Sequence, residues 1–183
     1  MFIVPLACVV MPGSVLGLAD TTAIPTGENV ETALERVGIS ASLGLVFKDL
    51  PKQIPTSNQN QWHEHLVYDF NGLRIEIQYT EYSPGHSIDM QKLKYRADKN
   101  TRVPQGVNLI SSSIVDVTYP GPVNGFTQTV VYSMPPMVKE RVYHISNLVK
   151  NNKQWIVSSS YKSCDEKGKR LAQSFLRSLE FSL

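Results

Sequence analysis

The dipeptide Asn71-Gly72 constrains the fold more than any other feature, because it separates two runs in which apolar and polar residues alternate. A type I′ turn needs positive φ at both central positions, and Asn followed by Gly accepts this conformation well. The turn fixes the register of the strands, with Phe70 opposite Leu73 and one further pair at each step outward. The sequence therefore predicts an antiparallel hairpin over residues 63–80.

Successive side chains of this hairpin point to opposite faces of the sheet. The face expected to join the core carries Trp62, Leu66, Tyr68, Phe70, Leu73, Ile75, Ile77 and Tyr79. The opposite face carries His63, His65, Val67, Asp69, Arg74, Glu76, Gln78 and Thr80. The hairpin is thus expected to have one apolar and one polar face.

The polar face places two histidines near a glutamate. His63 and His65 are neighbours on that face, and Glu76 lies diagonal to His65. Imidazole and carboxylate groups are ligands of zinc, so His63, His65 and Glu76 are candidates for part of a metal site. The mixed charges around them favour the alternative, an ordinary solvated strand surface.

The first nineteen residues carry no charge and end in "GLA", a small-x-small pattern typical of signal peptidase cleavage. We expect residues 1–19 to be a signal peptide and residues 20–183 to form one domain, exported to a bacterial periplasm. The basic segment that usually begins such a leader is missing, since the first basic residue is Arg36. A buried N-terminal segment or a membrane helix is the alternative.

Composition limits the class of protein. With 42% hydrophobic residues among 183, the chain is long enough for one domain with a substantial core. Its formal net charge is +2 and its basic residues are scattered, so no nucleic-acid partner is expected. Without the leader, Cys164 is the only cysteine, which excludes an intramolecular disulfide. We expect a partly buried, unreactive thiol there, because Asp165 and Glu166 follow it.

Helical periodicity occurs in three segments. The first covers residues 30–37 and ends at Gly38, and the second follows Ser87, its expected N-cap. The third begins with a predicted capping box at residues 163–166. Its expected core stripe is Leu171, Phe175, Leu176 and Leu179.

Further β-branched and aromatic runs predict strands between the second and third helices. These strands are expected at residues 111–119, 125–134, 140–150 and 154–162. The last two should form a second hairpin around Asn151-Asn152, and a short strand is expected at residues 45–48. His144 stands alone on its strand, so we expect a packed or surface histidine rather than a ligand.

This order of elements differs from the alternation of strands and helices in parallel-sheet proteins. It predicts an α+β fold in which helices flank an antiparallel β-sheet in a layered sandwich. The strand pairs followed by "DEKGKRLAQSFLRSLEF" resemble the PsbP-like fold family from the hairpin to the C-terminus. The helix at residues 30–37 is an addition to that family's pattern.

The resemblance implies a non-enzymatic, exported or lumenal binding and assembly factor, and the fold is also similar to that of immunity proteins that inhibit a secreted toxin. No catalytic residue carries over from it. The chain also lacks G-x-S-x-G, H-E-x-x-H and a Gly-rich phosphate loop.

We therefore expect a binding domain that recognises a protein partner and needs no cofactor. The expected contacts lie in two turn segments, "YSPGHS" and "YPGPVNGF", and are Tyr82, His86, Tyr119 and Phe126. One alternative is a metal-dependent enzyme or metal carrier that uses His63, His65 and Glu76. Another is a membrane-surface assembly factor tethered by an uncleaved leader, the one case in which membrane association is expected.

Overall fold

The computed structural model describes residues 30–43, 45–49, 62–99, 101, 106–121, 123–134 and 139–182. The predicted signal peptide, residues 1–19, lies outside the described residues. Among those that are described, no helix combines the length and the apolar composition needed to cross a membrane.

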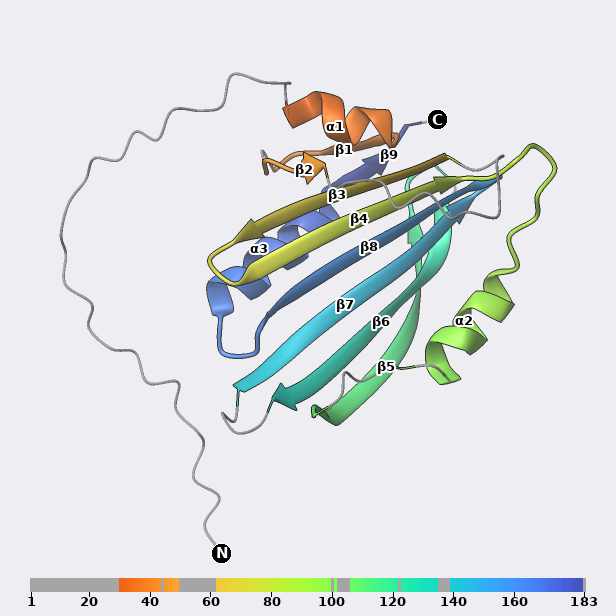
Figure 1. The fold of residues 1–183 in the computed structure, drawn as a ribbon. Helices are drawn as coiled ribbons and strands as arrows, with labels where there is room; N and C mark the ends of the chain where they lie inside the picture. Colours follow the sequence, from red (N-terminus) through yellow and green to blue (C-terminus); the bar gives the residue numbers. More distant parts are fainter. Residues whose placement is uncertain are drawn as a thin grey trace, which may run out of the picture.

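A seven-stranded antiparallel sheet, the main sheet, forms the body of the structure (Figure 1). Its strands are β2 (Lys48–Asp49), β3 (Trp62–Phe70), β4 (Leu73–Glu81), β5 (Asn108–Tyr119), β6 (Val123–Met134), β7 (Lys139–Lys150) and β8 (Lys153–Lys162). They lie in the order β2-β3-β4-β8-β7-β6-β5. Strands that follow one another in sequence are neighbours, except that β4 pairs with β8 and so joins the first hairpin to the later strands.

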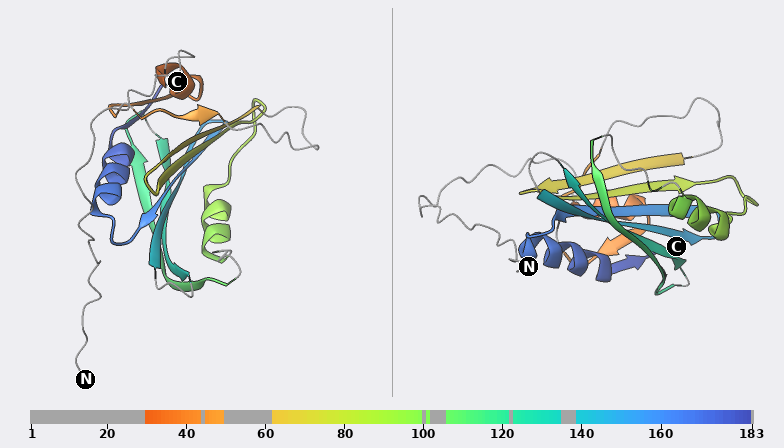
Figure 2. Two further views of the ribbon diagram at one scale, coloured as in Figure 1. Left: turned by 60° about the vertical axis from the view of Figure 1, so that its left-hand side comes forward. Right: turned by 90° about the horizontal axis from the view of Figure 1, so that it is seen from below.

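Helices lie on both faces of the main sheet (Figure 2). The helix α3 (Glu166–Arg177) covers one face, and α2 (Met90–Lys99) lies on the other. The helix α1 (Val30–Arg36) lies beside a small two-stranded sheet of β1 (Ile39–Ala41) and β9 (Leu179–Phe181). The predicted α+β class with an antiparallel sheet is confirmed.

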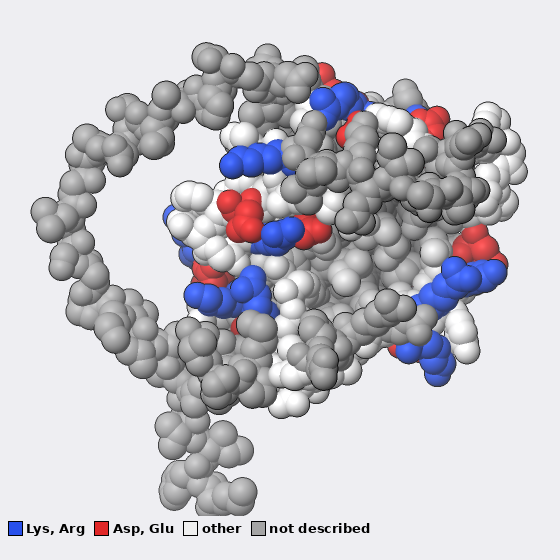
Figure 3. Space-filling model, in the orientation of Figure 1, with Lys and Arg blue, Asp and Glu red and all other residues white. Residues whose placement is uncertain are grey.

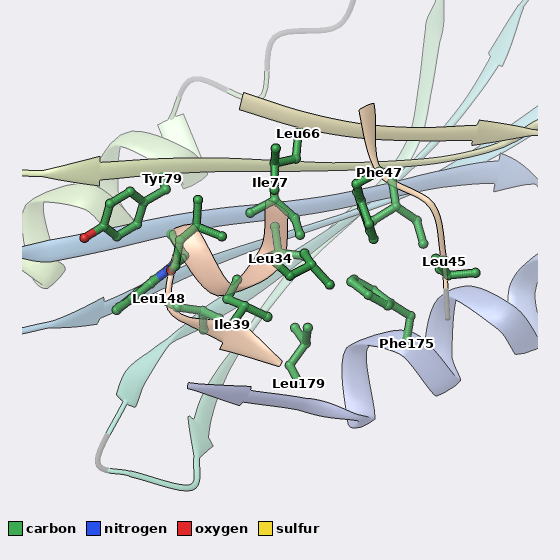
Figure 4. Packing of buried hydrophobic residues seen from close by; sticks show 14 of the residues in the cluster. Leu34, Ile39, Leu45, Phe47, Leu66, Ile77, Tyr79, Leu148, Phe175 and Leu179 are labelled. Carbon is green, nitrogen blue, oxygen red and sulfur yellow. The ribbon is translucent and has the colours of Figure 1, made fainter. Parts of the chain in front are cut away.

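The core lies between α3, the small sheet and one face of the main sheet (Figure 4). We call this the α3 face, and it carries fully buried residues such as Leu66, Ile77 and Trp155. The opposite side, the α2 face, carries Gln128, whose Nε2 donates to the carbonyl of Ala97 in α2. The cross-strand pairs place Gln128, Ile145, Ser158, Glu76 and Val67 on this same face.

The structure confirms both predicted hairpins. The eight predicted pairs of the first hairpin all form in the predicted register, and Trp62 with Glu81 adds a ninth. Asn71 and Gly72 have φ of 50° and 84°. The second hairpin turns at Asn151, with φ of 54°, and Asn152. Asn and Gly accept positive φ at such turn positions more readily than other residues do.

The predicted core face of the first hairpin is confirmed in its middle and wrong at its ends. Leu66, Leu73, Ile75, Ile77 and Tyr79 are buried. Trp62 and Phe70, the two end residues of β3, are instead 39% and 59% exposed. The alternation gives each residue its side of the sheet, but the core covers only the middle of this strand. Val67, predicted on the polar face, lies on the α2 face but is buried.

Local boundaries also needed correction. The Asp89 carboxylate accepts from the backbone N–H of Lys92 at 2.9 Å, so Asp89 rather than Ser87 caps α2. Asp165 caps α3 by accepting from the N–H of Gly168 at 2.9 Å, two residues after the predicted Ser163.

Three smaller expectations also differ from the structure. Cys164 is exposed instead of partly buried. The residue Leu179 is buried, but it belongs to β9 and not to the helix. The short strand expected at residues 45–48 is Lys48–Asp49.

Candidate functional site

The structure brings together only part of the predicted metal site. Nε2 of His65 lies 3.1 Å from Oε2 of Glu76. The His63 ring turns to another partner, with Nδ1 2.9 Å from the hydroxyl of Thr80. Its Nε2 is enclosed and has no hydrogen-bond partner in the described part of the chain.

Glu76 is already held by a cation. Nε of Arg74 donates to Oε1 of Glu76, and Nη1 of Arg74 donates to Asp69 at 3.3 Å. Partial burial alone would raise the pKa of Glu76, but hydrogen bonds from Arg74 and His65, together with the charge of Arg74, outweigh it and hold that pKa below its usual value. This cluster is an ion-pair network across β3 and β4.

No group of three or more His, Cys, Asp or Glu side chains that could hold a metal ion occurs among the described residues. Zinc binding at these residues would have to displace the hydrogen bond between His65 and Glu76 and the bond from Arg74 to Glu76. His63 could keep its bond to Thr80, because its Nε2 has no partner among the described residues.

Two of the predicted partner contacts lie together at one end of the sheet. The rings of Tyr82 and His86 stack at 4.5 Å with an angle of 13°. The hydroxyl of Tyr82 donates to Gln154 at 2.8 Å, and its backbone carbonyl accepts from the side chain of Asn152. Tyr82 is half-buried and His86 exposed, so this turn is fixed against the β7–β8 hairpin.

The other two predicted contacts are not surface loop residues. Phe126 lies within β6 and is fully buried, so the expectation of an exposed contact there is wrong. Tyr119 ends β5 half-buried, and its ring packs edge-on against Phe181 at 5.5 Å. Burial raises the pKa of Tyr119. Tyr119 packs against the core, whereas Phe126 is buried on the α2 face, opposite Asp116. The β5–β6 turn is shorter than the sequence suggested, so neither ring is a loop residue.

The feature that sequence reasoning missed is the edge of the sheet at β5. This strand has 12 residues and pairs only with β6 among the described strands. Leu109, Ile110 and Val115 are 46%, 50% and 62% exposed. The sequence did contain a signal, since residues 108–119 include one charge, Asp116, and no proline.

The opposite edge differs in kind. Its strand, β2, has two residues, and both are charged. An open hollow of about 500 Å³ beside β2 and β3 is lined by Leu45, Val46, Lys48, Val67, Tyr68, Asp69 and Phe70. A short, charged strand discourages pairing with another chain, so β5 is the edge at which another strand can pair.

Comparison with known proteins assigns no function. No family model matches the chain. An uncharacterized protein, VP3 of Colorado tick fever virus, is 31% identical over 81 residues, which are 44% of this chain and 6% of VP3. The crystal structure of PA94 from Pseudomonas aeruginosa, a protein of unknown function, aligns with a TM-score of 0.43 and 10% identity over 73% of this chain and 96% of PA94.

Proposed function

We propose that this protein is a non-catalytic binding domain that recognises a protein partner by adding a strand of that partner to β5. The observation that carries the proposal is the long, nearly uncharged edge with its exposed aliphatic residues Leu109, Ile110 and Val115. An edge strand presents unpaired backbone N–H and C=O groups, which pair readily with an extended segment of another chain.

Strand β5 has few of the features that normally protect an edge strand from pairing with another chain. The pairing of β5 with β6 is irregular between Leu109 and Ser111, and such a bulge protects the start of the strand. Beyond it, Ser111 to Tyr119 pair regularly with β6. The one charge, Asp116, accepts from Lys94 of α2 at 2.6 Å. The nine residues from Ser111 to Tyr119 therefore contain no lysine and no proline, and this stretch is long. The features that usually block strand addition are missing from it.

The chemistry of the edge describes the partner segment. It should be extended and free of charge, with apolar side chains facing both sides of the sheet, because Ile114 lies on the α2 face and Val115 on the α3 face. The resemblance to PsbP-like domains and the predicted signal peptide together suggest a setting: an exported, layered-sandwich domain that acts in the bacterial periplasm as an assembly factor or immunity protein.

The test is affinity capture with the full chain and with Val115→Lys, which places a charge on the edge. Wild-type protein should retain a partner that V115K loses, because a lysine on an edge opposes strand pairing. The matched control is Val46→Lys, since Val46 is 56% exposed and lies just before β2, at the opposite edge of the sheet. Equal capture by V115K and V46K, with both variants folded, contradicts strand addition at β5.

A metal-dependent enzyme or metal carrier is the second candidate, favoured by the enclosed, unpaired Nε2 of His63. Its test is metal analysis of protein purified without chelator, combined with thermal melting with and without zinc. Stoichiometric metal and a raised midpoint, both lost in His63→Ala, support this candidate, because a ligand bound only by the folded state stabilises it. No metal and no shift eliminate it.

A further inference from the structure

Arg141 occupies an unusual position at one end of the α2 face. It lies on β7, directly opposite Tyr132 on β6 and Lys162 on β8. Its Nη2 donates to the carbonyl of Gly72 at 3.1 Å and lies 3.4 Å from the hydroxyl of Ser160. The half-buried guanidinium therefore lies where the first hairpin, β7 and β8 meet.

The charge of Arg141 is not neutralised within the described part of the chain. No carboxylate there forms an ion pair with it, and its Nε is enclosed without a hydrogen-bond partner. A guanidinium has five N–H donors, and a partly buried one is costly without an anion. Its two acceptors among the described residues, a carbonyl and a hydroxyl, leave most of that donor capacity unused.

Arg74 provides a comparison on the same face. It lies on β4 opposite Ser160, and both Glu76 and Asp69 hold its guanidinium. Lys162, by contrast, is exposed and forms no ion pair with a described residue. Positive charge is therefore in excess around Arg141 and Lys162. Figure 3 shows Lys and Arg side chains on this side of the molecule, with Asp and Glu side chains among them near the β3–β4 turn.

Residues with hydroxyl groups neighbour Arg141 on the same face: Tyr132 lies opposite it, and Ser160 accepts from its Nη2. The rings of Tyr132 and Tyr143 stack at 4.8 Å with an angle of 20°. Burial, together with a hydrogen bond to Tyr143, raises the pKa of Tyr132, so its hydroxyl stays neutral. Ser160 pairs with Tyr143 across β7 and β8. Neutral hydroxyls of this kind can also donate to a bound oxygen, and the long 3.4 Å contact of Ser160 with Arg141 does not neutralise the guanidinium charge.

We propose that Arg141, Lys162 and Ser160 form an oxyanion-binding site for a carboxylate or phosphate group. The planar guanidinium can donate two parallel hydrogen bonds to such a group, which gives geometric selectivity over a simple halide. The ammonium of Lys162 on the adjacent strand adds a second charge. The site is independent of strand addition, since β6 separates β7 from the β5 edge.

The experiment titrates inorganic phosphate and, separately, acetate into the ¹⁵N-labelled full chain at constant ionic strength. Saturable amide shifts are expected around Gly72, Arg141 and Ser160. The stronger of the two responses identifies the source, because phosphate reports a phosphoryl ligand and acetate a carboxylate. Absence of saturable shifts with both probes overturns the proposal.

Variants locate the site. Arg141→Gln should weaken binding about tenfold or more, as expected when a charge-assisted pair is lost. Lys162→Met should weaken it less, while the exposed controls Arg96→Gln and Lys167→Met should bind as wild type does. Wild-type affinity in R141Q overturns the proposal.

A second substitution keeps the test decisive. Should R141Q fail to fold, Arg141→Lys retains the charge without the planar fork and must still bind more weakly than wild type. Equal affinity in this variant also overturns the site. V115K should keep full anion binding, so the two proposals fail separately.

Discussion

At the scale of single residues, Gly125 on β6 has no room for a side chain. A Cβ there would lie 1.9 Å from the carbonyl oxygen of Asn147 and 2.9 Å from its carbon. Because these are backbone atoms of β7, the two strands would have to separate. Gly125→Ala should therefore lower the free energy of unfolding by about 3 kcal/mol or more. Urea denaturation measures this, with Ser111→Ala on exposed β5 as the control; equal stability of the two variants contradicts it.

His144 links acidic pH to stability. Its Nδ1 lies 3.0 Å from the hydroxyl of Thr129 and its Nε2 lies 2.8 Å from that of Tyr161. Burial lowers the pKa of His144 below the ordinary value of 6.5, so the unfolded chain takes up a proton first. This contribution to stability is complete above pH 6.5 and is lost as the pH falls below it.

The prediction for His144 is a difference in pH dependence. Wild-type protein should lose stability from pH 7 to pH 5, and His144→Gln should lose less over the same range. Thermal melting at several pH values measures the slope, and the exposed His86→Gln is the control. A slope in H144Q as steep as that of wild type rules out His144 as the cause.

At the scale of elements, the start of α3 depends on one carboxylate. Asp165 satisfies the N–H of Gly168, which would otherwise lack a partner in the first turn. Asp165→Ala should cost about 1 kcal/mol, a typical value for the loss of an N-cap. Ser163→Ala, at the cap expected from sequence, should cost less than about 0.5 kcal/mol. Chemical denaturation compares them, and a larger effect of S163A would restore the predicted capping box.

The elements that sequence predicted well are those determined by neighbouring residues. Asn71-Gly72 determines its turn and hence the register of β3 with β4. The start of α3 was misplaced because Ser163 and Asp165 both suit a cap and the local pattern does not choose between them. The β1–β9 sheet was not predicted, because each strand has three residues and its partner lies at the other end of the described chain.

The candidate sites were harder to predict, for a related reason. Residue pairs within one hairpin, such as His65 and Glu76, follow from the turn. Exposure of Val115 and burial of Phe126 depend on which strand ends the sheet. Arg141 contacts Gly72 because β8 pairs with both β4 and β7 and so brings the first hairpin close to β7. No local sequence signal predicts the pairing of β4 with β8.

At the scale of the whole molecule, Trp155 connects the main sheet to the small one. Its ring is fully buried, and Nε1 donates to the carbonyl of Val37 at 2.7 Å. The ring also packs edge-on against Phe181 of β9 at 5.1 Å. The backbone N–H of Ser182 then donates to the carbonyl of Gly38 at 3.0 Å. These contacts predict that the two sheets unfold as one cooperative unit.

Trp155→Phe tests this coupling. The variant leaves the Val37 carbonyl without its donor and loses part of the indole's packing, so unfolding should cost about 2–4 kcal/mol less. Hydrogen exchange should show the amides of β1 and β9 opening faster together, because both depend on Trp155. Trp62→Phe, at the exposed end of β3, is the control and should change neither quantity much. Faster exchange in only one of the two short strands would mean that the small sheet is held by other contacts.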